Sequence, residues 1–362
     1  MKITSLNVTN FRNMSSLRVD FSEDANILYG DNGSGKTNLL EAVLVLCLGR
    51  SQRGAADGVM LRHDEDVYRI EGEIMEESRS HTVSVAYQRG TRRRITIDAV
   101  VSKVAELYDR FCAVSAGPED SEILSGSPSV RRLFMDIYTS QFSLDYLGCV
   151  TDYARTLSQR NAALRQESDT SPFDPLLVQY GSAVIVHRRG FISAVGDLAA
   201  RYYSEISGGG KLNIRYQPSV GSDLDDADTA AVQASFRERL SETYRHERAT
   251  MVTLVGPHRD EVLFDISGCP ARSYGSQGEL RTAAISLKLA VYQLLKEHRG
   301  ITPVLLLDEI FAELDATRSQ ALIEAFGDFG QLFLTTAAAP PQLLRQRGRS
   351  FKISRGTVQE AD

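Results

Sequence analysis

The segment NILYGDNGSGKTNLLEAVLVLCLG, residues 26–49, joins an apolar strand pattern, a glycine-rich loop and a long apolar helix pattern. Its centre, GDNGSGKT at 30–37, matches G-x-x-x-x-G-K-[ST] without a mismatch. The glycines allow backbone N–H groups to point inward around a phosphate without interference from a Cβ atom. Lys36 is placed to reach the outer phosphates, and Thr37 to offer its hydroxyl to Mg²⁺. The predicted nucleotide-binding residues of this segment are Gly30, Asp31, Asn32, Gly33, Ser34, Gly35, Lys36, Thr37 and Asn38.

A second apolar run, PVLLLDE at 303–309, ends in two carboxylates. A buried strand would deliver Asp308 to its carboxyl edge, beside the phosphate loop, where it can hold Mg²⁺ or its waters. Glu309 is then placed to polarise the attacking water as a general base. Lys36, Asp308 and Glu309 are therefore the predicted catalytic residues, and Thr37 and Asp308 the predicted metal ligands. Asp315, in FAELDATR, is by itself an N-cap candidate before a helix.

A third segment, SYGSQGELRTAAISLKLA at 273–290, has the pattern of an anion-binding helix N-terminus. Ser276, Gln277 and Gly278 are short or flexible enough to leave backbone N–H groups accessible, and apolar residues recur behind them at helical spacing. The chain thus carries two candidate phosphate-binding helix ends.

Strand and helix patterns alternate at both ends of the chain, with mainly helical patterns between them. This indicates an α/β domain interrupted by a helical lobe. The predicted divisions are 1–127, with the phosphate loop and an antiparallel β meander, 128–250, a mainly helical lobe in which two long segments run to residue 206, and 251–362, with the third segment and the Asp-Glu strand.

Bulk composition is that of an ordinary globular protein, with 42% apolar and 24% charged residues and no apolar run long enough to span a bilayer. The first residues alternate like a strand and do not resemble a signal peptide. The cysteines have no metal-ligand spacing, which predicts buried thiols in a reducing cytoplasm. They are Cys47, Cys112, Cys149 and Cys269.

The net charge of −6 argues weakly against a nucleic-acid partner. Local basic clusters keep that partner open, although each cluster is also consistent with a solvated surface. The clusters are Arg92–Arg94, Arg131–Arg132, His187–Arg189 and the tail RQRGRSFK.

The order of these motifs resembles that of the ABC-type ATPases, and within them the RecF family of the SMC-like branch. The resemblance rests on NVTNFRN, GDNGSGKTNLLEA, GPEDSEILSGSPSVRRLFMD, LVGPHRDE, YGSQGELRTAAISLKLA and LLLDEIFAELDATR, which follow one another over nearly the whole chain. It implies an ATP-dependent homodimer with two nucleotides sandwiched between protomers. Ser276, Gln277 and Gly278 would then contact the partner's ATP, and Asp315 would cross the interface as the D-loop residue. Arg12 and Asn13 match the family's N-terminal nucleotide-contacting segment.

The same resemblance implies a weak ATPase of recombinational repair, with ATP and Mg²⁺ as cofactors. Its implied partners are double-stranded DNA and ss–ds junctions, RecR with RecO, and the recombinase RecA, which it would help to load at gaps. Slow hydrolysis would reset the dimer. DNA is expected across the top of the dimer, with Arg92–Arg94 and Arg131–Arg132 as the first candidate contacts. The expected location is the cytoplasm, in association with the nucleoid.

Two positions depart from the ABC pattern. The strand before the helical lobe ends in FCAVSAGPED, which offers Glu119 and Asp120 where ABC enzymes usually carry a glutamine. The strand after the Asp-Glu pair gives Thr335 and Thr336 where transporters carry a histidine. Both departures disfavour the main alternative, a nucleotide-binding subunit of a transporter. A nuclease fusion would need a separate acidic cluster, which the sequence lacks. The chemistry of GPHRDE, ending at Glu261, is not assigned, and its position suggests a role in ordering the third segment.

Overall fold

The computed structural model describes residues 1–52, 54–221, 224, 226–313, 322, 329–337 and 347–361. The chain forms two compact units. One contains Met1–Asp120 and Lys288–Asp362, and the other contains Ser121–Leu287. We call them the nucleotide unit and the helical unit. Each is described by itself.

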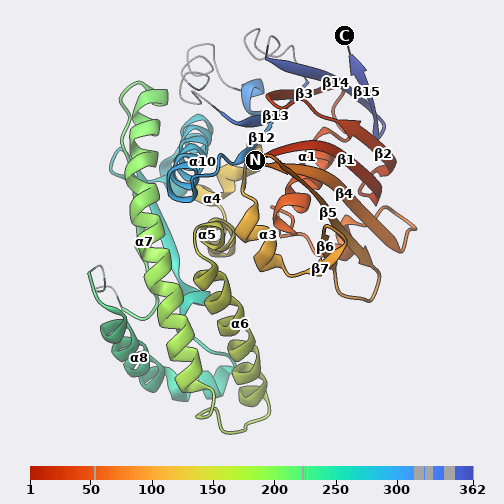
Figure 1. The fold of residues 1–362 in the computed structure, drawn as a ribbon. Helices are drawn as coiled ribbons and strands as arrows, with labels where there is room; N and C mark the ends of the chain where they lie inside the picture. The colour runs from red at the N-terminus through yellow and green to blue at the C-terminus, as the bar shows by residue number, and fades with distance from the viewer. Residues whose placement is uncertain are drawn as a thin grey trace. The chain divides into compact units, whose positions relative to one another are not determined.

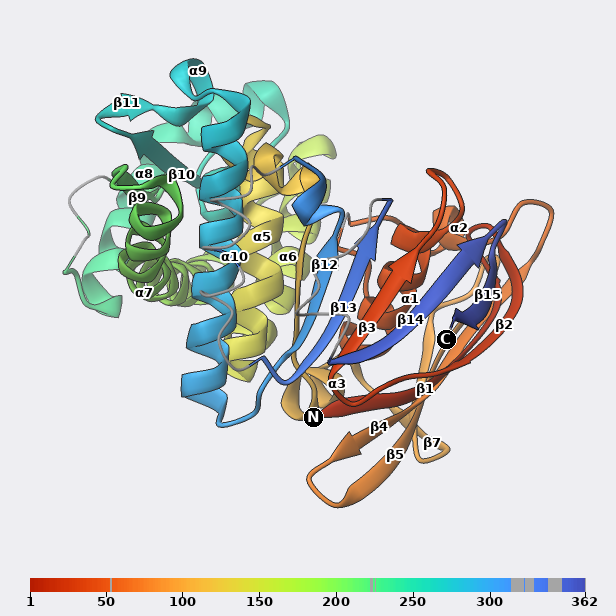
Figure 2. The same cartoon turned by 90° about the horizontal axis from the view of Figure 1, so that it is seen from above.

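A mostly parallel sheet forms the centre of the nucleotide unit. Its strand order is β15-β14-β3-β13-β12-β8, and only the outer β15 runs antiparallel to its neighbour. Figure 2 shows β12, β13, β3 and β14 side by side. The strands are β3 (Ala25–Tyr29), β8 (Ala113–Ala116), β12 (Val304–Asp308), β13 (Gln331–Thr336), β14 (Gly348–Ser354) and β15 (Thr357–Ala361). Because the parallel strands share one direction, their carboxyl ends lie at one edge, where ligands bind in such sheets.

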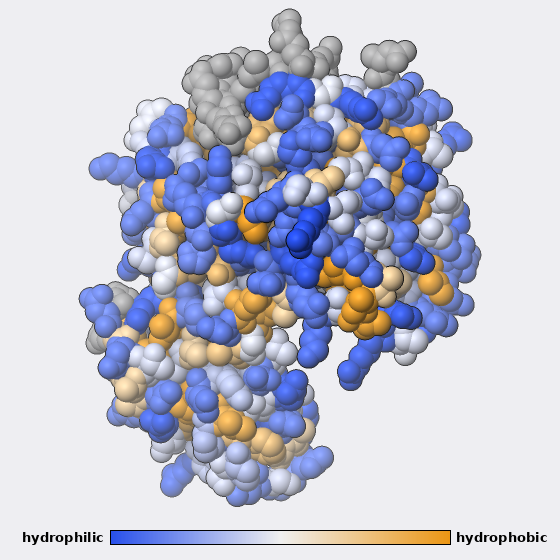
Figure 3. Space-filling view, viewed as in Figure 1, coloured by the Kyte–Doolittle hydropathy of each residue, from blue (hydrophilic) through white to orange (hydrophobic). Residues whose placement is uncertain are grey.

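An antiparallel sheet forms the second layer of this unit, in the order β2-β1-β4-β5-β6-β7. Its β4–β5–β6 meander is the one predicted. The strands are β1 (Lys2–Phe11), β2 (Met14–Asp20), β4 (Val67–Glu76), β5 (Arg79–Gln88), β6 (Arg94–Ile97) and β7 (Val100–Ser102). Val100 and Val101 of the edge strand are more than 60% exposed, and Figure 3 shows hydrophobic residues gathered where Figure 1 places β6 and β7.

Helix α1 (Lys36–Leu48) joins the two sheets. It contacts β1, β4 and β5 of the antiparallel sheet and β8, β12 and β13 of the parallel sheet. This explains why its sequence is apolar all round, since a helix covered on both sides has no solvent face. Gln331 adds a polar link between the layers, because its amide accepts from the backbone N–H of Ile3 and donates to the carbonyl of Ile3, each at 2.7 Å. The short helices described in this unit are α2 (Asp57–Met60), α3 (Val104–Arg110) and the 3₁₀ turns η1 (Pro118–Ser121) and η3 (Ile310–Glu313).

Between residues 128 and 206 the helical unit has three helices where two long segments were predicted, and the further helix predicted through RERLSETYRHER is present as α8. The elements are α4 (Glu122–Ser125), α5 (Pro128–Phe142), α6 (Leu144–Arg165), α7 (Asp174–Ser207), α8 (Thr229–Thr250), η2 (Pro257–Arg259) and α9 (Ala271–Tyr274). The first segment divides because Ser143 is an extended N-cap whose hydroxyl accepts from the N–H of Tyr146 at 3.2 Å. Figure 1 shows α6, α7 and α8 running beside one another, around a core that includes Tyr153, Leu177 and Phe236.

The helical unit also extends further along the sequence than the predicted division after residue 250. Its three-stranded sheet, in the order β11-β10-β9, pairs β9 (Leu212–Gln217) with β10 (Glu261–Ile266) and β10 with β11 (Cys269–Pro270). These pairings hold residues beyond 250 in the helical unit. Helix α10 (Gln277–Arg299) begins in this unit and continues into the nucleotide unit, so the boundary falls within a helix and not in a linker.

The GPHRDE segment is a hub of the helical unit in which Gly256, Pro257 and Asp260 are buried and Arg259 is exposed. Asp260 is fully buried and accepts from Tyr216 Oη and, at 2.8 Å, from the N–H of Ser219. Glu261 forms a two-point ion pair with Arg131. His258 Nδ1 lies 2.6 Å from Tyr153 Oη. The segment therefore holds α5, α6 and β9 together, and its predicted role in ordering the third segment stays a prediction.

This hub changes the interpretation of the basic clusters. The Arg131 side chain is 4% exposed and fixed by Glu261, and Arg132 donates to the carbonyl of Asp260 at 3.0 Å. Arg188 is also buried, with Asp136 at 2.7 Å. Arg131 is therefore a structural residue and does not fit the expectation of a DNA contact.

The four cysteines fit the prediction of buried thiols only in part. Cys47 and Cys112 are buried, and burial raises the pKa of Cys112 to about 11. Cys149 is half-buried, and Cys269, in contrast, is exposed in β11.

Candidate nucleotide site

The glycine-rich loop lies between the end of β3 and the start of α1, and close contacts leave no room for a side chain at two of its glycines. Gly30 has φ of 151°, and a Cβ atom there would lie 2.2 Å from the carbonyl oxygen of Ile353. Gly35 has φ of 113°, and its Cβ would lie 2.8 Å from Asn13 Nδ2. A side chain at Gly30 would displace β14, one at Gly35 would displace the Asn13 amide, and both φ values favour glycine.

The ammonium of Lys36 is held inside this loop. Its Nζ atom donates to the carbonyls of Gly30 at 2.8 Å and Asp31 at 3.1 Å, and it forms an ion pair with Glu309 at 3.0 Å. The side chain is only 4% exposed. Three oxygens therefore fix a buried positive charge in the concave side of the loop, where phosphate oxygens can replace them as partners.

Asp308 lies at the carboxyl end of β12, directly opposite the start of α1. Thr37 Oγ1 is 2.9 Å from both oxygens of its carboxylate. The structure thus brings together the two predicted metal ligands, although they are far apart in sequence. A hydroxyl and one carboxylate, with phosphate oxygens and waters completing the shell, fit the ligand preference of Mg²⁺. In the described part of the chain, no group of three or more His, Cys, Asp and Glu residues is gathered for a metal held by protein alone.

Thr335, one of the two positions that depart from the ABC pattern, organises the carboxylates. Its Oγ1 donates to Asp308 Oδ1 at 2.6 Å and accepts from the N–H of Glu309 at 2.9 Å. Glu309 has φ of 50°, an uncommon conformation for a residue other than glycine. Its Oε2 accepts from the N–H of Ala337 at 3.1 Å. The threonine hydroxyl and these backbone contacts therefore fix where the predicted base points.

The two N-terminal candidates occupy different positions. Asn13 lies against the loop, since its Nδ2 donates to the carbonyl of Ser34 at 3.3 Å and its Oδ1 accepts from Asn38 at 2.8 Å. The guanidinium of Arg12 instead forms a two-point ion pair with Glu41 at 2.8 and 2.9 Å. Asn13 is thus a neighbour of the phosphate loop, and Arg12 is held by α1.

The third segment begins α10 with a capping box. Ser276 is exposed, its N–H and hydroxyl donate to Glu279 Oε2 at 2.9 and 2.7 Å, and its Oγ accepts from the N–H of Glu279 at 3.3 Å. Gln277, the first residue of the helix, is also exposed. The sequence alone predicted the helix start but not the role of Glu279. Asp315 lies outside the described residues.

Comparisons with known proteins agree with this arrangement of motifs. The RecF/RecN/SMC N terminal domain family matches residues 2–345. A DNA replication and repair protein RecF of Symbiobacterium thermophilum is 35% identical over 369 residues, covering 99% of this chain and 98% of its own. The Bacillus subtilis protein of the same name is 33% identical over 370 residues, covering 99% and 100%.

The chain belongs to the RecF family. A solved structure of the recombination mediator protein RecF with ATP, in the RecFOR pathway, matches with a TM-score of 0.92 at 30% identity, covering 100% of this chain and 98% of that one. An SMC head bound to the C-winged helix domain of ScpA shares the fold alone, with a TM-score of 0.55 at 14% identity.

Membership of the RecF family confirms the predicted fold class, an α/β ATPase head of the SMC-like type with an antiparallel β subdomain and a mainly helical lobe. It also favours the RecF-like interpretation over the transporter subunit. Among the helices that the structure describes, none combines the length and apolar character that crossing a bilayer requires.

Within this RecF-family head, the structure adds a residue that sequence reasoning missed. Gln52, in the loop after α1, lines a cavity with Thr37, Asp308 and Glu119. Its only sequence signal is a polar residue just beyond an apolar helix, which is common. Glu119 and Asp120 both line this cavity, and Asp120 is 6% exposed and accepts from the N–H of Gly117 at 2.8 Å.

Proposed function

We propose that this RecF-family chain is an ATP-dependent DNA-binding protein of recombinational repair. In this proposal ATP joins two copies into a homodimer, the dimer binds double-stranded DNA and ss–ds junctions, and it helps to load RecA at gaps with RecR and RecO. The observation that carries the proposal is the phosphate loop beside Asp308 and Glu309 in the nucleotide unit. The RecF relatives and the ATP-bound RecF structure support it.

The residues of the nucleotide unit divide the work on ATP. Lys36 binds the outer phosphates in place of its carbonyl partners, and Thr37 and Asp308 hold the metal side of the pocket. Bound Mg²⁺ would neutralise charge on the phosphate oxygens. Glu309 orients water and accepts its proton, with the side chain aimed by the Thr335 contact to its backbone.

The start of α10, where Ser276 and Gln277 are exposed, is the part of the chain that we propose contacts a second copy in the dimer. The start of α10 is a helix N-terminus, a kind of site suited to a phosphate. There the Ser276 N–H and hydroxyl, which now donate to Glu279, would exchange that carboxylate for phosphate oxygens, beside Gln277 and Gly278. We propose that they contact the γ-phosphate bound by the second copy, with Asp315 crossing the same interface. Hydrolysis removes that shared phosphate and lets the copies separate, so slow turnover acts as a timer.

DNA binding is proposed to be independent of sequence and sensitive to salt, because it would rest on phosphate contacts. Arg92 and Arg94 are exposed and remain candidates, whereas Arg93 is paired with Asp57 at 2.7 Å. The chain's net charge of −6 means that such contacts must be local.

Sedimentation with and without ATP tests the dimer, and duplex DNA added at two salt concentrations tests the DNA contact. Lys36→Ala should weaken ATP binding by about 100-fold, since it removes a charged donor to phosphate, and should abolish ATP-dependent dimers. Lys352→Ala, an exposed lysine of the same unit, is the control. Dimers that form equally well with Lys36→Ala would refute the nucleotide-gated mechanism.

A further inference from the structure

A series of polar side chains leads away from the nucleotide pocket, beginning at Gln52. This residue lines the cavity that also contains Thr37 and Asp308. Its Nε2 donates to Asp120 Oδ1 at 3.0 Å, and its Oε1 accepts from Ser115 Oγ. Asp120 is an acceptor when ionised, which fixes the amide orientation. Gln52 therefore lines the pocket, while the nitrogen of its amide is held by Asp120 and the oxygen by Ser115.

The second step of the series is a buried ion pair. Lys288 Nζ lies 2.9 Å from Asp120 Oδ1 and donates to the carbonyl of Ser115 at 2.8 Å. Lys288 is 2% exposed and Asp120 is 6% exposed. The remaining oxygen of Asp120 accepts from the N–H of Gly117 at 2.8 Å. Apolar residues of similar size often stabilise a protein as well as such a pair does, so its use here points to a demand for specific geometry.

The ion pair joins the two places where the chain passes between its units. Asp120 is the last residue of the nucleotide unit before the chain leaves it, and Lys288 is the first residue after it returns. Lys288 is also part of α10, the uninterrupted helix whose N-terminus carries Ser276. About three turns of helix, roughly 18 Å, separate Ser276 from Lys288. A small rotation of α10 at Lys288 thus becomes a larger displacement at Ser276.

We propose that Gln52, Asp120 and Lys288 form a coupling latch that makes the position of α10 depend on what fills the nucleotide pocket. The inference rests on the proposed function, in which Ser276 serves a second copy. Charge placed beside Thr37 and Asp308 reorients the Gln52 amide. The Asp120 carboxylate moves with it because Gln52 donates to Asp120, and Lys288 moves in turn because it is paired with Asp120. These are positioning residues, since the Asp120–Lys288 pair acts on the start of the third segment through helix α10.

Hydrogen exchange with and without ATP measures the latch directly. In the unaltered chain, ATP should change amide exchange at residues 277–280. Lys288→Met keeps the length of the side chain and removes its charge, so it should abolish that change while ATP affinity stays within about twofold. Gln293→Ala is the matched control, because Gln293 lies on the same helix and bonds only to the exposed Glu297 four residues later among the contacts described for it.

A double-mutant cycle supplies a second measurement. Gln52→Ala and Lys288→Met should each lower ATP-dependent dimerisation by about tenfold. The double variant should lower it by little more than either, because both substitutions interrupt the same series of contacts from Gln52 through Asp120 to Lys288. Asp120→Asn, which keeps the size of the side chain, should behave like Lys288→Met and guards against a variant that fails to fold.

The outcomes are distinct. Loss of ATP affinity in parallel with the exchange response would make Lys288 a merely structural residue and overturn the latch. An exchange response that persists in Lys288→Met, or is absent from the unaltered chain, would overturn it as well. If ATP changes exchange at 277–280 only with the latch intact but no dimer forms, the latch holds and the proposed dimer function fails.

Discussion

Charged residues are used in opposite ways in the two units. In the nucleotide unit, Lys36, Asp308 and Glu309 gather at the carboxyl edge of a parallel sheet, next to a cavity. In the helical unit, buried arginines are neutralised by buried or half-buried carboxylates, as in the pair of Arg160 with Glu247, where both side chains have no exposure. The same residue types therefore line a proposed ligand site in one unit and fix internal geometry in the other, and their surroundings distinguish the two arrangements.

Glu309→Gln tests the proposed ligand site of the nucleotide unit and should have the largest effect, which is on ATP hydrolysis. Removing the proposed base should slow ATP hydrolysis by about 10²–10⁴-fold, while ATP binding and dimerisation persist, because the amide retains the shape. Single-turnover hydrolysis and the lifetime of ATP-bound dimers on DNA measure this. Glu360→Gln, which alters an exposed carboxylate of β15, is the control. Hydrolysis at the unaltered rate would assign the base to another residue.

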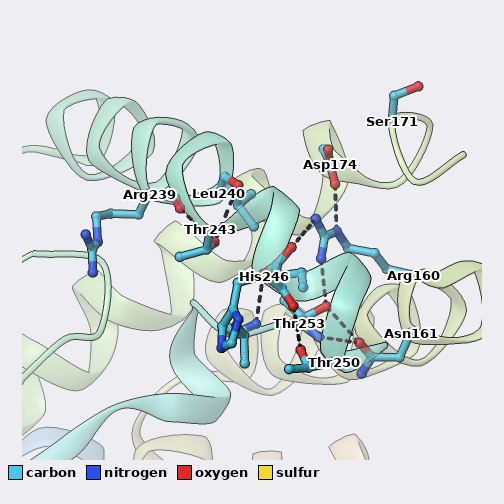
Figure 4. A network of polar contacts seen from close by, with 12 residues as sticks. Arg160, Asn161, Ser171, Asp174, Arg239, Leu240, Thr243, His246, Thr250 and Thr253 are labelled. Atoms are coloured by element: carbon cyan, nitrogen blue, oxygen red, sulfur yellow. Dashed lines mark hydrogen bonds and ion pairs between the residues drawn. The ribbon is translucent and has the colours of Figure 1, made fainter. Parts of the chain in front are cut away.

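Arg160→Met tests the structural role of buried charge in the helical unit, because it removes the buried pair of Arg160 with Glu247. Figure 4 shows the Arg160 guanidinium between Asp174 and the segment that carries Thr253, and its distances are 2.7 Å to Asp174 and 2.8 Å to Thr253 Oγ1. The substitution leaves Glu247 buried without its partner, which should cost about 3–5 kcal/mol of unfolding free energy in the helical unit.

Hydrogen exchange across α6 to α8 measures this loss region by region. Arg155→Met, on the same helix, removes an exposed pair with Asp152 and should change stability by less than about 1 kcal/mol. Replacing Glu247 by Gln in the Arg160→Met background should recover part of the loss, because it removes the unpaired charge. Equal effects of Arg155→Met and Arg160→Met would contradict the distinction between buried and exposed pairs.

The contrast also explains what the sequence could predict. The meeting of the phosphate loop with Asp308 and Glu309 was predictable, because these residues stand at recognisable spacings along the chain. The meander and α1 followed from periodicity. Arg131 was misread as a candidate DNA contact, because its partner Glu261 lies far along the sequence and only tertiary structure brings them together. Gln52 and Lys288 were missed for the same reason. The end of the helical unit was misplaced because β9 pairs with β10 across α8.

Thr335→Val tests how sharply the nucleotide unit orients its carboxylates. Valine keeps the shape of threonine but removes the contacts to Asp308 Oδ1 and to the N–H of Glu309. We expect hydrolysis to fall by about tenfold with little change in ATP affinity, as for the loss of one hydrogen bond to a charged group. Steady-state turnover and nucleotide titration separate the two effects. Thr357→Val, exposed on the same sheet, should be neutral, and an unchanged turnover in Thr335→Val would leave Thr335 without a positioning role.

The smallest expected effect concerns His258, whose protonation makes the stability of the helical unit depend on pH. Burial lowers the pKa of His258 from 6.5 to about 4, opposed by its bond to the Thr253 carbonyl and assisted by Arg259, Arg132 and Arg160. Because the folded chain disfavours the protonated ring, stability from this residue is complete above pH 6.5 and is lost as pH falls toward 4.

The expected loss is about 1 kcal/mol between pH 7 and pH 5.5. The ring nitrogen beside Tyr153 Oη and the neighbouring arginines leave no carboxylate in direct contact to stabilise the charged form among the bonds described for His258. Denaturant unfolding of the full chain at several pH values measures the slope. His258→Gln should reduce it, whereas His246→Gln, an exposed histidine of α8, should leave it unchanged. Equal slopes in all three proteins would mean that the hub tolerates a charged ring, and that the helical unit is less strictly closed to solvent than its buried ion pairs indicate.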